Sequence, residues 1–117
     1  MKDSVVRNRS FEFVLLIMQL SQCLQNEQHE FVLSRQVLRS GTAIGPLIRE
    51  AHQAESKADL VYKMAIALKE ANETEYWIKL LEGSKQIERS FSASLQADLN
   101  VSLKLLPAII KTAKANK

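Results

Sequence analysis

The fold of this chain is decided by residues 60–81, which read LVYKMAIALKEANETEYWIKLL. Mostly apolar or small side chains recur here at alternating intervals of four and three residues: Leu60, Met64, Ala67, Ala71, Thr74, Ile78 and Leu81. Such spacing lines up side chains on one face of an α-helix, whereas a strand would scatter them over both faces. The stretch therefore predicts a long amphipathic helix whose buried face packs against other helices.

The residues flanking this stretch predict where the helix begins and ends. Ser56 is a favourable N-cap, and Asp59 stands three residues later, in the capping-box position. Gly83 occupies the place where a glycine in the left-handed conformation commonly closes a helix. We therefore predict a helix over residues 57–82.

Three more helices are predicted, over residues 10–24, 30–54 and 88–114. Ser10 is the expected N-cap of the first, and Pro46 and Pro107 predict local bends inside the second and fourth. The inward-facing positions are Phe13, Ile17, Leu20 and Leu24; Val37, Gly41, Ile44, Ile48 and Ala51; and Leu95, Leu99, Leu103, Leu106 and Ile110. Four such helices with short connections favour one all-α domain over residues 1–117, an antiparallel up-down-up-down four-helix bundle.

The first helix carries more apolar surface than one buried face requires. Beside the inward stripe lies a second one, made of Phe11, Val14, Leu15 and Met18. Either the helix sits centrally in the core of the monomer, or this face meets a second subunit. The second alternative predicts a homo-oligomer.

Gly41 and Gly45 form a G-x-x-x-G pair in the second helix. Each glycine costs up to about 1 kcal/mol relative to alanine, so close approach of another helix should compensate. A phosphate-cradling loop is disfavoured, because no strand precedes the pair and no G-K-[ST] follows it. We interpret the pair as a packing device.

No catalytic or metal-binding pattern is found in the sequence. Glu-x-x-His motifs are missing, and His29 and His52 fall in a connection and near a helix end, which favours surface or capping roles. Cys23 is the single cysteine, with no partner for an internal disulfide, as is typical of a reducing compartment. No apolar run is long enough to span a bilayer. We expect a cytoplasmic protein with no membrane association, no cofactor, no metal and no enzymatic activity.

A net charge of +3 and a pI near 9.1 permit nucleic-acid binding without demonstrating it. The candidate cations lie on the second and third helices: Arg35, Arg39, Arg49, Lys57, Lys63 and Lys69. An oligomer would repeat this patch and strengthen its attraction for phosphates. The alternative is a solvated face, balanced by Glu50, Glu55, Glu73 and Glu75.

The polar run 69–75 interrupts the third helix. Lys69 and Glu73 are four residues apart and can pair on the helix surface. Asn72 lies beside the apolar stripe, where a polar side chain can fix helix register or subunit number. We favour this structural role over catalysis.

Three segments identify a family resemblance: residues 33–45 (LSRQVLRSGTAIG), residues 56–59 (SKAD) and residues 66–77 (IALKEANETEYW). The chain resembles four-helix bundle proteins encoded by intervening sequences inside some bacterial large-subunit ribosomal RNA genes. These proteins are related to the accessory variability determinant of diversity-generating retroelements. The motif residues are Ser40, Gly41, Thr42, Gly45, Glu50, Ser56, Asp59, Glu70, Asn72, Glu73, Tyr76 and Trp77. One departure is Pro46-Leu47, where the family usually has Ala-Asn.

The resemblance implies a bundle assembled as a ring of five, with no known enzymatic activity and a role in binding nucleic acid. The retroelement relatives also engage a reverse transcriptase. Our first hypothesis is therefore a non-enzymatic, homopentameric accessory protein that binds RNA or DNA through basic helix surfaces. The alternative is a scaffold that holds a partner enzyme, such as a reverse transcriptase, without touching nucleic acid.

Overall fold

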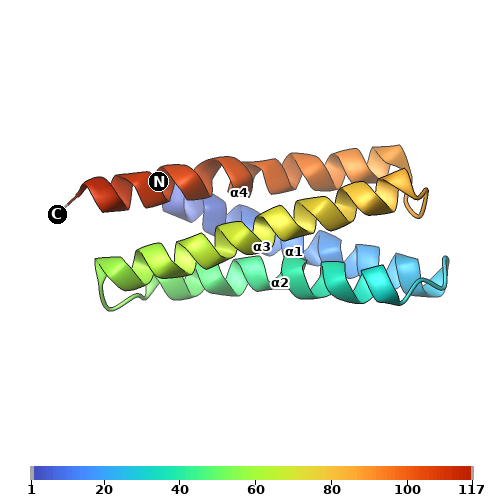
Figure 1. The fold of residues 1–117 in the computed structure, drawn as a ribbon, viewed down its shortest axis with the longest axis horizontal. Helices are drawn as coiled ribbons and strands as arrows, with labels where there is room; N and C mark the ends of the chain where they lie inside the picture. Colours follow the sequence, from blue (N-terminus) through green and yellow to red (C-terminus); the bar gives the residue numbers. More distant parts are fainter. Residues whose placement is uncertain (1, 117) are drawn as a thin grey trace.

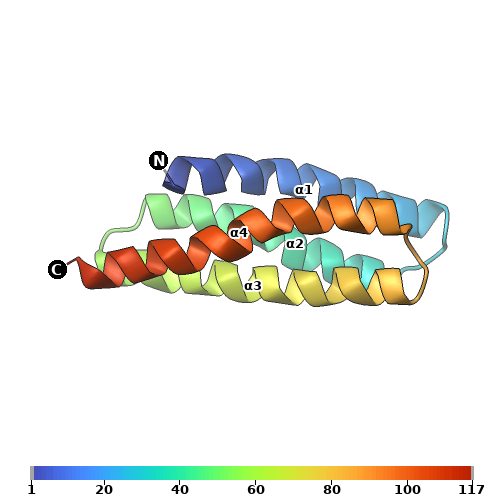
Figure 2. The same ribbon diagram turned by 90° about the horizontal axis from the view of Figure 1, so that it is seen from above.

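The computed structural model describes residues 2–116, with side chains from Val5 onward, and this part of the chain forms four α-helices. They are α1 (Lys2–Asn26), α2 (Val32–His52), α3 (Lys57–Gly83) and α4 (Arg89–Ala115). Successive helices run in opposite directions along a rod of 50 × 21 × 19 Å (Figure 1). Both ends of the chain therefore lie at the same end of the rod (Figure 2). The predicted all-α, up-down-up-down bundle is confirmed.

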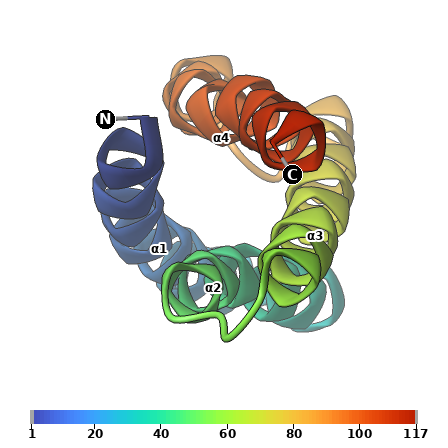
Figure 3. The same cartoon turned by 90° about the vertical axis from the view of Figure 1, so that its left-hand side faces the viewer.

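Viewed along the rod, the helices follow one another around a central core (Figure 3). Each helix packs against two others, so that α1 also contacts α4. The predicted stripes of α2 and α3 face this core, and only Leu60 among them is half-buried. In α4, Leu103 and Ile110 are half-buried, while Ser102 and Ile109 are buried.

The start of α1 differs from the prediction. The helix begins at Lys2, and Ser10 lies inside it, where its hydroxyl donates to the Arg7 carbonyl at 2.8 Å. The reason is Val6, which is fully buried and continues the core stripe seven residues before Phe13. Ser10 is therefore a buried helical serine, and the prediction that it caps α1 is wrong.

The N-cap predicted for α3 is confirmed, because the Ser56 hydroxyl accepts a hydrogen bond from the Asp59 amide at 3.1 Å. At the other end Gly83 is the last helical residue, and its φ is not positive. The residue in the left-handed conformation is Lys85 (φ 61°). Its amide donates a hydrogen bond to the Glu82 carbonyl, and the next amide, that of Gln86, donates to the Leu81 carbonyl. The closing motif is thus formed two residues later than predicted, and without glycine.

The start of α2 also differs from the predicted Glu30. This residue lies just before the helix, and its carboxylate accepts hydrogen bonds from the Leu33 and Ser34 amides at 3.1 and 2.8 Å. A carboxylate at this end satisfies amides that have no helical partner and favours the positive end of the helix dipole. Glu30 therefore caps α2 rather than beginning it.

The prediction that glycine brings helices together is confirmed at Gly41. A Cβ placed there would lie 2.9 Å from both Cγ atoms of Ile17 on α1. At Gly45 the nearest side-chain atom, Val14 Cγ2, would be 3.5 Å away, an ordinary contact. Pro46 and Pro107 are exposed, and α2 and α4 continue through them. Gly41 is therefore required for packing, whereas Gly45 leaves a small gap.

The second stripe of α1 is not covered by the rest of the chain. Phe11, Leu15 and Met18 are 58, 52 and 47% exposed, and Val14 is half-buried. A central place in the core therefore does not account for these side chains.

Candidate nucleic-acid interface

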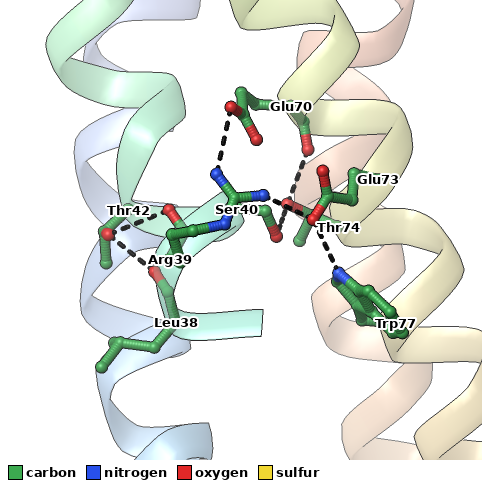
Figure 4. A network of polar contacts seen from close by, with 8 residues as sticks. All are labelled: Leu38, Arg39, Ser40, Thr42, Glu70, Glu73, Thr74 and Trp77. Atoms are coloured by element: carbon green, nitrogen blue, oxygen red, sulfur yellow. Dashed lines mark hydrogen bonds and ion pairs between the residues drawn. The ribbon is translucent and has the colours of Figure 1, made fainter. Parts of the chain in front are cut away.

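A network of charged side chains connects α2 to α3 in the middle of the bundle (Figure 4). Arg39 of α2 pairs with two carboxylates of α3, with Nη1 3.3 Å from Glu70 Oε2 and Nη2 close to Glu73 Oε2. The Trp77 indole donates to the same Glu73 oxygen at 3.0 Å. The indole and Arg39 together lower the pKa of Glu73, and hydrogen bonds to Glu73 and Glu70 raise the pKa of Arg39. Both groups therefore stay ionised at neutral pH.

Beneath this network lies a buried pair of hydroxyls. Thr74 Oγ1 is 2.8 Å from Ser40 Oγ and 2.8 Å from the Glu70 carbonyl oxygen. One arrangement satisfies all three groups: Ser40 donates to Thr74, which donates to the carbonyl four residues back. A second buried pair, Ser21 and Ser34 at 3.0 Å, lies between α1 and α2. These pairs fix the register of neighbouring helices.

Asn72 does not fix helix register within the bundle, because its side chain is exposed; a role in setting subunit number stays a prediction. Ser40 and Thr74 fix the register instead, since buried polar groups constrain register when they must find each other. Tyr76 is likewise exposed, and its ring meets Trp77 edge to face at 5.4 Å. The polar run 69–75 thus mainly serves the contact between α2 and α3.

Two of the six candidate cations are engaged by carboxylates. Arg39 is held by Glu70 and Glu73, and Lys63 Nζ lies 2.8 Å from Glu50 Oε1, a contact that raises the pKa of Lys63. These cations join α2 to α3 rather than pointing to a ligand. Four other candidate cations are exposed and form no ion pair with any of the described side chains, those of residues 5–116: Arg35, Arg49, Lys57 and Lys69.

Two of these four cations, Arg49 and Lys57, border different hollows of the surface. Arg35 and Arg49 lie on α2, and Lys57 and Lys69 on α3. Lys57 borders a hollow of about 540 Å³ with Lys114 of α4 and the exposed Tyr62. Arg49 borders a hollow between α2 and α1, beside Arg7. Arg49 therefore lies beside the contact of α1 and α2, and Lys57 beside that of α3 and α4.

The hollow beside Arg49 has a volume of about 300 Å³. Its lining comes from α1 (Arg7, Ser10, Phe11, Val14) and α2 (Thr42, Gly45, Pro46, Arg49). Thr42 turns its hydroxyl to the Leu38 carbonyl at 2.6 Å, so the hollow keeps a mainly apolar floor. Sequence reasoning missed Arg7 here because it placed this residue before the helix, and it interpreted Phe11 only as part of the second apolar stripe of α1. The heptad from Val6 to Phe13 was the signal that could have placed Arg7 in the helix.

The histidines occupy structural positions. His52 Nδ1 lies 2.8 Å from the Ile48 carbonyl near the end of α2, the capping position that the sequence favours. His29 lies in the connection before α2 with a φ of 53°. Among the described residues, no three His, Cys, Asp or Glu side chains are grouped to hold a metal ion. Over the same residues, no helix combines the length and apolar character needed to cross a membrane.

The comparisons with known proteins identify the family. Residues 2–108 match the 23S rRNA-intervening sequence protein family. The chain belongs to this family. A crystal structure of a family relative from Bacteroides thetaiotaomicron, described as a protein of unknown function from the S23 ribosomal protein family, has 54% sequence identity. It superimposes with a TM-score of 0.92 over 95% of this chain and 99% of the other. No curated protein matches the chain.

The match covers helices that the sequence motifs did not reach. The quoted segments lie in α2, at the start of α3 and in α3, whereas residues 2–108 also include α1 and most of α4. The resemblance to 23S rRNA-intervening sequence proteins is therefore confirmed over nearly the whole chain.

Proposed function

We propose that this 23S rRNA-intervening sequence protein is a non-enzymatic accessory protein that binds nucleic acid as a homo-oligomer in the cytoplasm. The observation that carries the proposal is the set of exposed cations that form no ion pair with a carboxylate of residues 5–116. Arg35, Arg49, Lys57 and Lys69 keep their charges available for phosphates. The name of the family refers to ribosomal RNA, which supports nucleic acid as the class of ligand.

Oligomerisation strengthens such an interface. Leu15 and Met18 expose apolar surface on α1, and no cation stands beside them in the sequence. We propose that a second copy of the chain covers this surface. Each phosphate contact releases counterions, so the slope of the logarithm of the binding constant against the logarithm of the salt concentration grows with the number of contacts. A few cations per subunit, repeated around a ring of five as the resemblance implies, would then bind appreciably.

The test is fluorescence anisotropy with labelled single-stranded, duplex and structured RNA, between about 50 and 200 mM salt. Arg35→Gln with Lys69→Gln should weaken binding of every probe and reduce the salt dependence. Lys104→Gln on α4 is the control for a lost surface charge. Failure of all three probes to bind oligomeric protein at low salt would refute the proposal.

A second candidate function is a scaffold for a partner protein, and the hollow at Tyr62 favours it. The hollow is lined by Val61, Tyr62 and Ala65 with lysines at its margins, as an acidic and apolar peptide would require. A stoichiometric protein partner recovered after nuclease treatment, and lost with Tyr62→Ser, would support this function. A partner released by nuclease would argue for the first.

A further inference from the structure

Three residues stand between two adjoining hollows on the outer surface of α1 and α2. Arg7, Phe11 and Arg49 line both the apolar hollow described above and a second one of about 330 Å³. The second hollow adds the polar side chains Asn8 and Glu12. Phe11 therefore presents its ring between an apolar hollow and a polar one, with a guanidinium from each helix beside it.

The geometry points to a site for single-stranded nucleic acid, in which a base stacks on Phe11 and enters the apolar hollow while Arg7 and Arg49 hold the flanking phosphates. This inference rests on the proposed nucleic-acid function and adds residues to it. Aromatic rings beside cations are the recurring platform for single strands, because every base has a face that can stack. Duplexes keep their bases paired and cannot offer one to the ring.

The dimensions and charges of the site fit this ligand. A volume of about 300 Å³ lies at the lower end for small-molecule sites, which suits one base better than a larger group. Phe11 is 58% exposed, so its ring is available without rearrangement. Arg7 and Arg49 form no ion pair within the described residues, and the anionic neighbour Glu12 pairs with Arg9 at 3.6 Å.

The hollow owes part of its space to Gly45. A methyl group there would make an ordinary contact with Val14 at 3.5 Å, so the helices would tolerate it while the floor of the hollow became shallower. Pro46 beside it presents a ring without an amide hydrogen, which keeps this wall apolar. Gly45 and Pro46 thus both help to shape the site.

A second copy of the chain is the competing occupant, since Phe11 is continuous with Leu15 and Met18. Charge decides between them. Arg7 and Arg49 flank Phe11 and form no ion pair with any side chain of residues 5–116, and burial against an apolar partner would leave both charges without a counterion. We therefore assign Phe11 to nucleic acid and leave Leu15 and Met18 to the contact between subunits.

The experiment compares short labelled oligonucleotides: single-stranded poly(U), an abasic strand of equal length, and a duplex. Phe11→Ser should weaken poly(U) binding about tenfold and leave the abasic strand unchanged, because only the base is lost from the site. Phe11→Tyr should restore binding, and Gly45→Ala should weaken poly(U) selectively. Arg7→Gln and Arg49→Gln should weaken both strands and lower the salt slope by about 0.7 each. Phe31→Ser is the matched control, an aromatic residue of similar exposure (52%) that lies outside both the proposed site and the proposed contact between subunits.

The outcomes separate this site from the general function. If the unmodified protein binds no probe, the proposed function fails and the site with it. If it binds but Phe11→Ser changes nothing, or weakens poly(U) and abasic strands equally, the site alone is wrong. Light scattering is measured in parallel, and dissociation of the oligomer by Phe11→Ser would assign the ring to a second copy and overturn the inference.

Discussion

Replacing each glycine by alanine provides the sharpest test of the packing between α1 and α2. In a helix interior the substitution gains about 1 kcal/mol from propensity alone. At Gly41 the new methyl would lie 2.9 Å from two atoms of Ile17, a fully buried side chain with a stiff χ1. Overpacking of this kind costs about 1–3 kcal/mol, so the net effect should be a loss of about 1 kcal/mol.

At Gly45 the nearest side-chain atom would be 3.5 Å away, and at Gly83 nothing lies within 4 Å. Gly45→Ala should therefore stabilise the protein by up to about 1 kcal/mol. Gly83→Ala at the last residue of α3 controls for propensity without any new contact. Gly41→Ala and Gly45→Ala should thus differ by about 2 kcal/mol, or roughly 8 °C in Tm for a chain of this size.

The assay is urea unfolding followed by far-UV circular dichroism, at one protomer concentration because an oligomer's stability depends on it. Ile17→Ala should remove the clash, so that Gly41→Ala no longer destabilises in that background. The reasoning would be refuted if Gly41→Ala were as stable as Gly45→Ala, or if its cost were unchanged without the Ile17 side chain.

Three further predictions concern individual side chains. Trp77 and Arg39 lower the pKa of Glu73, so the ionised carboxylate stabilises the folded protein at pH values above the ordinary glutamate pKa. This stabilisation is lost as the pH falls through the lower pKa of the folded state. Acid titration of Trp77 fluorescence should therefore show a transition below the ordinary glutamate range, and Glu73→Gln should abolish it. Thr74→Val should cost about 1–3 kcal/mol by leaving the Ser40 hydroxyl unsatisfied, and adding Ser40→Ala should recover part of the loss in urea unfolding. Partial burial and the nearby Glu27 carboxylate raise the pKa of the Cys23 thiol. At neutral pH this thiol should therefore react several-fold more slowly with a disulfide reagent than free cysteine does. Equal rates would contradict the raised pKa.

The helices could be predicted because their core faces repeat with helical period over several turns. The 4-and-3 spacing from Met64 to Leu81 leaves one face to bury, and the Ser56 cap is a local signal. The start of α1 was harder, since only Val5 and Val6 are apolar between Lys2 and Ser10, and Val6 is buried only because α1 begins before Ser10. At the end of α3, Lys85 adopts the left-handed conformation that glycine usually occupies. A prediction based on the position of glycine therefore places the end of the helix at Gly83, two residues too early.

The candidate site was less predictable, because charge pairing depends on which helix faces are neighbours. Arg39 and Glu73 are 34 residues apart, and nothing local indicates that they meet. Lys63 and Glu50 likewise pair only through the antiparallel contact of α2 and α3. A list of cations from sequence therefore mixes residues that hold the bundle together with residues that remain available.

This distinction also explains where a ligand should be sought. The most recognisable motif residues, such as Arg39, Gly41 and Glu73, are already used by contacts between helices. Because they hold neighbouring helices of the bundle together, they have little capacity left for a partner. Binding must then rest on groups without internal partners among the described residues: Arg35, Lys57 and Lys69 inside the motif segments, and Arg7 and Phe11 outside them. A chain could keep the whole motif and lose Arg7 and Phe11, and it would retain the fold and the motif cations without the stacking site proposed at Phe11.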